Sequence, residues 1–116
     1  MTETTNLTVG GSEMEMLIAR PEGPGPHPGL IMGIHAPAYT GLEADRFTVY
    51  AAERYAAQGY MTIAPFLFHR YPLDGERQVK IDGLRDDNIL ADMNAARDFL
   101  GAMEDVDNDR IGVLGH

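Results

Sequence analysis

Three short apolar runs, separated by two segments of helical periodicity, constrain the fold of this chain more than any other feature. The runs are Leu30–His35, Tyr60–Ala64 and Arg110–Leu114. A continuous apolar run of this length predicts a strand buried on both faces, as in a mostly parallel sheet. Because parallel neighbours need a crossover connection, we expect a helix in each intervening segment. The order therefore predicts an α/β fold, with right-handed connections and helices on both faces of the sheet.

Both helices are indicated by the spacing of their apolar residues. The first follows the capping-box spacing of Thr40-Gly41-Leu42-Glu43, and Gly59 can end it in a left-handed conformation. Its predicted buried face has gaps of three and four residues: Ala44, Phe47, Ala51 and Tyr55. The second helix has the most regular period in the chain: Ile89, Met93, Ala96, Leu100 and Met103.

The N-terminal segment predicts a β-hairpin ahead of these elements. Apolar residues alternate on both sides of Gly10-Gly11: Leu7, Val9, Met14, Met16 and Ile18. The two glycines can adopt the positive φ angles that a two-residue hairpin turn requires. The segment Arg20–Gly29 contains four prolines, which remove donors and fix φ. We therefore predict a surface loop there, with His27 exposed to solvent.

Composition narrows the class of protein. A chain of 116 residues with 44% hydrophobic and 23% charged residues is typical of one soluble globular domain. The net charge of −9 argues against nucleic acid or an anionic membrane as a partner. The absence of Cys excludes disulfides and Cys-based zinc sites. Because Met1–Gly11 lacks the pattern of a signal peptide and no apolar run could cross a bilayer, we expect a cytoplasmic protein.

The last two residues suggest a chemistry. In α/β-hydrolases a buried strand ends in G-x-[SC]-x-G, a strained turn that raises a nucleophile above the sheet. Gly115 and His116 fit its first two positions, so the nucleophile would be the next residue. The preceding strand would also have an unpaired apolar edge, and such edges recruit other strands. We therefore expect residues 1–116 to be the N-terminal part of a single domain, continued beyond His116 or on a second chain.

Several segments together resemble the dienelactone hydrolase family, a branch of the α/β-hydrolases. They occur in the family's order and cover nearly the whole chain. The matching segments are Arg20–Gly23, Pro26–Gly29, Ile34-His35, Ala56–Tyr60, Ala64–Arg70, Ala91–Ala96 and Asp109–His116.

The resemblance implies a carboxylic ester or lactone hydrolase. A Cys or Ser nucleophile, with Asp and His partners, would form an acyl-enzyme that water then releases. All three would lie beyond His116, so we assign no catalytic residue to this chain. The resemblance implies no metal and no cofactor. The expected partners are a small ester or lactone, which can be anionic, and the remaining part of the hydrolase domain.

The part present here would contribute to the oxyanion hole and the pocket. In this fold one amide belongs to the residue after the nucleophile, and the other to the loop after the Leu30–His35 strand. Because Pro37 has no N–H, that donor would be Ala36, Ala38 or a neighbour, with Ala38 the first choice. We expect His35 and Tyr39 to line the pocket. The alternatives are a structural His35 and a loop that only caps the following helix.

Family members hold a substrate carboxylate with an Arg in the region after the second apolar run. A guanidinium suits this planar, bidentate partner. Arg70 matches its motif, and Arg77 is a second candidate; a surface ion pair is the alternative for each. Two residues depart from the family pattern: Ala36 stands where a thiol-controlling Glu is common, and Phe66 where an Asp is common. They concern the mode of thiol activation and the dienelactone substrate, not the fold. The alternative function is a non-catalytic protein of this fold that binds a small molecule or partner.

Other acidic residues have simpler interpretations. Asp105, Asp107 and Asp109 alternate as in a calcium loop, but its central Gly and closing Glu are missing. We predict a strand-entry turn there. Asp92 is interpreted as a helix-surface or buried hydrogen-bonding residue. No G-x-G-x-x-G or Walker A motif follows a predicted strand, which argues against a nucleotide-binding domain of flavodoxin type.

Overall fold

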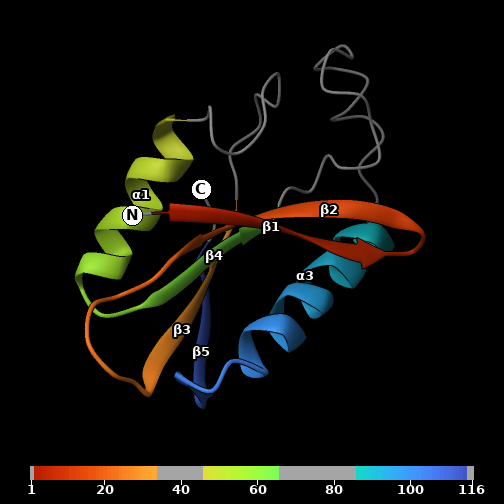
Figure 1. Cartoon of the computed structure of the whole chain (residues 1–116). Coiled ribbons are helices and arrows are strands. Elements are labelled where there is room, and N and C mark those ends of the chain that lie inside the picture. Colours follow the sequence, from red (N-terminus) through yellow and green to blue (C-terminus); the bar gives the residue numbers. More distant parts are fainter. Residues whose placement is uncertain (1, 34–45, 66–85, 115–116) are drawn as a thin grey trace.

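The computed structural model of the protein describes residues 2–33, 46–65 and 86–114 (Figure 1). These residues form strands and helices in the order expected from the sequence. The elements are β1 (Thr2–Val9), β2 (Ser12–Ala19), β3 (His27–Met32), α1 (Arg46–Ala57), β4 (Met61–Pro65), α3 (Asp86–Gly101) and β5 (Val106–Leu114).

The strands form one five-stranded sheet in the order β1-β2-β4-β3-β5. The hairpin strands β1 and β2 are antiparallel to each other, and β2 is antiparallel to β4. β3 lies between β4 and β5 and is parallel to both. The chain thus crosses from β3 to β4 in one direction and returns past β3 to β5 in the other. Right-handed crossovers in opposite directions place their helices on opposite faces of the sheet.

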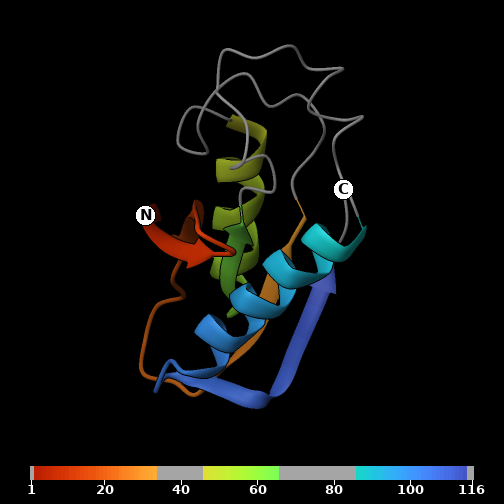
Figure 2. The same ribbon diagram turned by 90° about the vertical axis from the view of Figure 1, so that its right-hand side faces the viewer.

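The two helices do cover opposite faces (Figures 1 and 2). On the α3 face, Ala96 and Leu100 pack on apolar side chains of the sheet: Met14, Met16, Ile18, Ile31, Met61 and Ile63. On the α1 face, Ala52 and Ala56 pack on a second set: Leu17, Ala19, Met32 and Ala64. Alternation along β2 and along β4 divides these residues between the two faces. The predicted α/β fold, with helices on both faces and an N-terminal hairpin, is confirmed.

The hairpin turn and the end of α1 both depend on glycine. Gly10 and Gly11 have φ angles of 57° and 81°, as a two-residue turn with right-handed twist requires. At the end of α1, Gly59 has a φ angle of 99°. The Gly59 N–H donates to the Ala56 carbonyl at 2.9 Å, and the Tyr60 N–H donates to the Tyr55 carbonyl at 3.2 Å. This pair of bonds is a Schellman motif, which confirms the predicted helix end.

The buried face of α1 differs in part from the prediction, and the predicted Ala44 lies outside the described residues. The buried residues of α1 are Thr48, Ala52 and Ala56, whereas Phe47 is 50% exposed. Ala51 and Tyr55 are only partly buried. Both sets repeat at helical spacing, so periodicity alone cannot choose between them. The small side chains allow a close approach of helix to sheet, and the aromatic side chains lie to one flank.

The boundaries of β3 and β5 also differ from the prediction. β3 begins at His27, inside the segment predicted as a loop, and ends at Met32; Ile34 and His35, which the prediction included, lie outside the described residues. His27 is half-buried, and its N–H donates to the Asp105 carbonyl at 2.7 Å. β5 begins at Val106 rather than Arg110. β3 starts this early because His27 and Pro28 pair with Val106 and Asp107 of β5. Pro28 has no N–H to donate to the ladder, and a proline is tolerated there because the ladder is irregular directly after it.

The long second helix agrees with its prediction. α3 spans Asp86–Gly101, and Ala96 and Leu100 are fully buried. Met103 lies just beyond the helix and packs at the edge of the same core. The strand predicted at Tyr60–Ala64 is observed one residue further on, because Tyr60 belongs to the turn after α1 and is 37% exposed.

Candidate active site

The candidate site lies at the carboxyl ends of the three parallel strands. Because β3, β4 and β5 are parallel, their last residues, Met32, Pro65 and Leu114, share one edge of the sheet. The strand order changes direction at β3, and ligands of open α/β sheets bind outside the carboxyl ends beside such a switch point. The topology therefore indicates a site above β3 and its neighbours.

β3 and β5 remain paired up to this edge. Met32 is the register partner of Leu114, and the Gly33 N–H donates to the Leu114 carbonyl at 2.7 Å. Beneath them, Ile31, Met32 and Ala64 are at most 1% exposed. A dry, packed base of this kind strengthens electrostatic interactions made above it.

The side chains and amides predicted for the site lie outside the described residues. They are His35, Ala36, Ala38, Tyr39, Arg70, Arg77, Gly115 and His116. The structure does describe the strand ends that precede them. Gly33 stands two residues before His35, and Leu114 stands immediately before Gly115. The predicted oxyanion loop and the predicted nucleophile turn therefore follow two residues that share a hydrogen bond. The assignments of the individual residues remain predictions.

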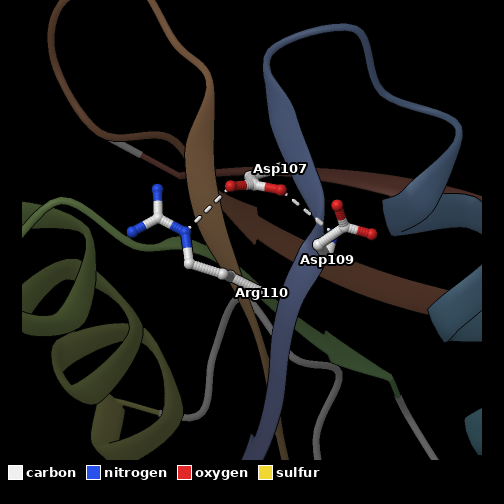
Figure 3. Close-up of polar contacts among 3 residues, drawn as sticks. All are labelled: Asp107, Asp109 and Arg110. Atoms are coloured by element: carbon white, nitrogen blue, oxygen red, sulfur yellow. Dashed lines mark hydrogen bonds and ion pairs between the residues drawn. The ribbon is translucent and has the colours of Figure 1, made fainter.

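Near the N-terminal end of β5, Asp107 makes a polar contact that the sequence did not predict (Figure 3). The Asp107 carboxylate accepts the Asp109 N–H at 3.0 Å and the Arg110 Nε–H at 2.8 Å. The Asp109 amide, and then the Arg110 guanidinium, lower the pKa of Asp107 below its ordinary value. Among the described residues, no three His, Cys, Asp or Glu side chains are grouped to hold a metal. The one sequence signal for the contact of Asp107 with Arg110 was the spacing of three residues between an acidic and a basic side chain.

Asp92 is a buried polar residue on α3. Its side chain is fully buried and takes part in a polar interaction. This agrees with the second of its two interpretations, a buried hydrogen-bonding residue.

The free edge of β5 is the other exposed feature of this region. In the described part of the chain β5 pairs with β3 alone, and Val113 is 65% exposed. The predicted unpaired edge of the last strand is thus confirmed for these residues. Neither of the described helices combines the length and apolarity that a membrane span requires.

In the described part of the chain, surface grooves lie along α1. One of about 450 Å³ is lined by residues at its C-terminal end and after β2: Arg20, Pro21, Glu22, Glu53, Ala56, Ala57 and Gly59. It lies at the amino end of β4, away from the candidate site. Its Arg20 is ion-paired with Glu3. The second, of about 290 Å³, includes Tyr50 and Arg54, whose guanidinium lies 5.6 Å from the Tyr50 ring centre.

The sheet order, the two covered faces and the paired carboxyl ends of β3 and β5 define part of an α/β-hydrolase-type domain. A model of the dienelactone hydrolase family matches residues 14–116. The chain belongs to the dienelactone hydrolase family.

Known relatives are similar over almost the whole chain. The 2,6-dihydropseudooxynicotine hydrolase of Paenarthrobacter nicotinovorans is 32% identical over 97% of this chain and 28% of its own length. A dienelactone hydrolase-like promiscuous phosphotriesterase from metagenomic libraries superposes with a TM-score of 0.81 at 19% identity, covering 99% of this chain and 48% of its own. A Klebsiella pneumoniae protein assigned to the dienelactone hydrolases gives a TM-score of 0.80 at 22% identity, covering 99% and 49%. The chain thus spans half or less of the length of these relatives.

Proposed function

We propose that this chain forms the N-terminal part of a carboxylic ester or lactone hydrolase of the dienelactone hydrolase type. Its nucleophile would be the residue directly after His116, and its Asp and His partners would lie further on. The proposal rests on family membership together with one geometric observation. That observation is the 2.7 Å hydrogen bond from the Gly33 N–H to the Leu114 carbonyl.

This hydrogen bond matters because acyl transfer needs two amides close to the nucleophile. One amide would follow the nucleophile, a few residues after Leu114, and the other would come from the segment after Gly33. Strand ends joined by a hydrogen bond are a suitable starting point for both. Ala38 is the first candidate for the second amide and Ala36 the next, with His35 and Tyr39 beside them in the pocket.

The chemistry would follow the acyl-enzyme route. The nucleophile gives its proton to the His partner and adds to the ester carbonyl, and the negative charge that develops on oxygen is stabilised by the two amides. Collapse of this intermediate releases the alcohol, which takes a proton from the His partner. Water then adds to the acyl-enzyme with the same His as base, and the acid leaves. In a lactone the alcohol and the acid belong to one product molecule.

The remaining part of the domain is the proposed partner of this chain. It would supply the triad and pair with the free edge of β5, where Val113 is 65% exposed. An apolar side chain on an unpaired edge strand is a site for further strand pairing.

The proposed substrates include anionic esters and lactones, held by Arg70 and, as a second candidate, Arg77. In the complete protein, Arg70→Ala should raise KM for an anionic ester more than for its neutral analogue. Removing a ground-state contact acts on KM before kcat. Equal effects on both substrates would remove Arg70 from the site.

The residues encoded after His116 provide the first test. A Cys or Ser followed by x-Gly, with Asp and His further on, is expected. Expression of the complete protein should then give turnover of a p-nitrophenyl ester, and Ala at the nucleophile position should abolish it. Natural Ala or Gly at that position, together with no turnover, would instead support the non-catalytic binding protein.

A further inference from the structure

β5 contains a bulge that separates it into two parts. Pro28 is the register partner of Asp107, and Gly29, the next residue of β3, is the partner of Ile111. Three residues of β5 therefore have no partner in β3: Asn108, Asp109 and Arg110. Extra residues bend the strand that carries them, and β5 shows two straight parts joined by a sharp bend (Figure 2).

The bulge determines where β5 leaves the sheet. If the ladder continued regularly from the Pro28–Asp107 pair, every later residue of β5 would lie three positions further along β3. At about 3.3 Å per residue this displacement is roughly 10 Å. A shift by an odd number also exchanges the two faces of the strand. The hydrogen bond between Gly33 and Leu114 could not survive it.

The contact that closes the bulge comes from Asp107. Its two carboxylate oxygens accept hydrogen bonds from two residues of the bulge, Asp109 through its backbone N–H and Arg110 through its side chain (Figure 3). The Asp107 side chain is 28% exposed and the Arg110 side chain 63% exposed, so the acceptor is the better shielded partner. One carboxylate thus links the last residue before the bulge to the last residue within it.

Packing on either side of the bulge favours the same register. Val106, before the bulge, is buried in the core cluster on the α3 face, and Ile111, after the bulge, packs against the same cluster. These contacts place each part of β5 separately. Asp107 adds the contact that joins the two parts.

We propose that Asp107 is a positioning residue, whose carboxylate holds the bulge closed and thereby sets where β5 meets Gly33 and leaves the sheet. The inference rests on the proposed function in one respect only: that the nucleophile turn starts where β5 ends.

Amide hydrogen exchange, measured by NMR on the complete protein, tests the proposal. In Asp107→Ala the Gly33 N–H should exchange roughly ten-fold faster, as expected when hydrogen bonds to a charged group are lost. Amides of the β1–β2 hairpin should keep their rates, because that hairpin is at the other edge of the sheet. Asp107→Asn retains an acceptor for the Asp109 N–H and should show a smaller effect at Gly33.

Asp109→Asn is the matched control, because it removes a neighbouring charge while keeping the backbone N–H that Asp107 binds. It should leave the Gly33 rate unchanged. The proposal is wrong if Asp107→Ala leaves Gly33 unchanged, if Gly33 and the hairpin accelerate equally, or if Asp109→Asn has the same effect. Should Asp107→Ala not fold, the comparison of Asp107→Asn with Asp109→Asn decides between the same outcomes.

A second readout addresses the catalytic meaning. In the complete protein, Asp107→Asn should lower kcat several-fold with KM nearly unchanged, whereas Asp109→Asn should alter neither. An unchanged kcat in Asp107→Asn would refute an effect of Asp107 on catalysis and leave it a role in the fold alone. An inactive wild type with a protected Gly33 amide would refute the proposed function and leave the exchange result for Asp107 intact.

Discussion

Gly29 offers a sharp test of the packing between β3, β5 and α3. A Cβ at this position would lie 2.8 Å from Leu100 Cδ2 and 3.2 Å from Ile111 Cγ1. Leu100 is fully buried, so it has little room to yield. Inserting a methyl group into a packed core costs about 1–3 kcal/mol. We therefore expect Gly29→Ala to destabilise the chain by about that amount.

A double-mutant cycle isolates the contact responsible. Leu100→Ala removes the colliding methyl groups and by itself should cost about 2–5 kcal/mol. Native domains have roughly 5–15 kcal/mol of stability, so this variant of the complete domain should remain folded. In the Leu100→Ala background, Gly29→Ala should cost little, because its new methyl group occupies part of the cavity. The expected coupling is about 1–3 kcal/mol.

Urea unfolding followed by far-UV circular dichroism measures all four corners of the cycle. Gly112→Ala is the matched control, since a Cβ there meets only Leu30 Cδ1 at 4.0 Å, and it should be neutral or stabilising by up to about 1 kcal/mol. Additive effects of Gly29→Ala and Leu100→Ala would refute the reasoning. So would a loss of stability in Gly112→Ala as large as in Gly29→Ala.

Three further predictions concern the helix end, the bulge and the chain as a whole. Gly59→Ala should cost about 1–2 kcal/mol in urea unfolding, because the φ angle of 99° is unfavourable for a side chain although no atom lies within 4 Å; an unchanged midpoint would contradict this. Since the pKa of Asp107 is lowered from 3.8, its stabilising contribution is present above that value and is lost as the pH falls below it. Wild type and Asp107→Asn should therefore differ in stability at pH 6, and the difference should shrink as the pH is lowered below 3.8; a difference that does not change with pH would contradict the assignment. The 116-residue chain alone should not hydrolyse a p-nitrophenyl ester, because the nucleophile is expected after His116; robust turnover would contradict the proposed division of the site.

Local sequence signals predicted the individual elements well. The hairpin follows from Gly10-Gly11, because few other residues adopt two successive positive φ angles. The period of α3 and the glycine after α1 were equally informative. These signals depend on interactions within a few residues, which are visible in the sequence itself. The order of elements then implied a sheet with helices on both faces.

The candidate site was predictable in outline. Gly115-His116 after an apolar strand, and a loop after the Leu30–His35 run, indicated two segments that belong together. The structure shows that the strands before them are paired neighbours, with Met32 opposite Leu114. The residues assigned to the pocket and to the substrate carboxylate lie outside the described residues and stay predictions.

Several features were decided only by tertiary structure. Apolar spacing could not choose between Phe47 and Thr48 for the buried side of α1, because the choice depends on how closely the helix approaches the sheet. A strand starting at His27 could not be read from a proline-rich segment, because its partners lie near Val106, far away in the sequence. The bulge at Asn108–Arg110 could not be read either, because it depends on the register in which the two parts of β5 pair with β3. The sequence by itself thus determined which elements form and their class of fold, since local conformational preferences are encoded in adjacent residues. Register, buried faces and strand exits were determined only when distant segments packed together.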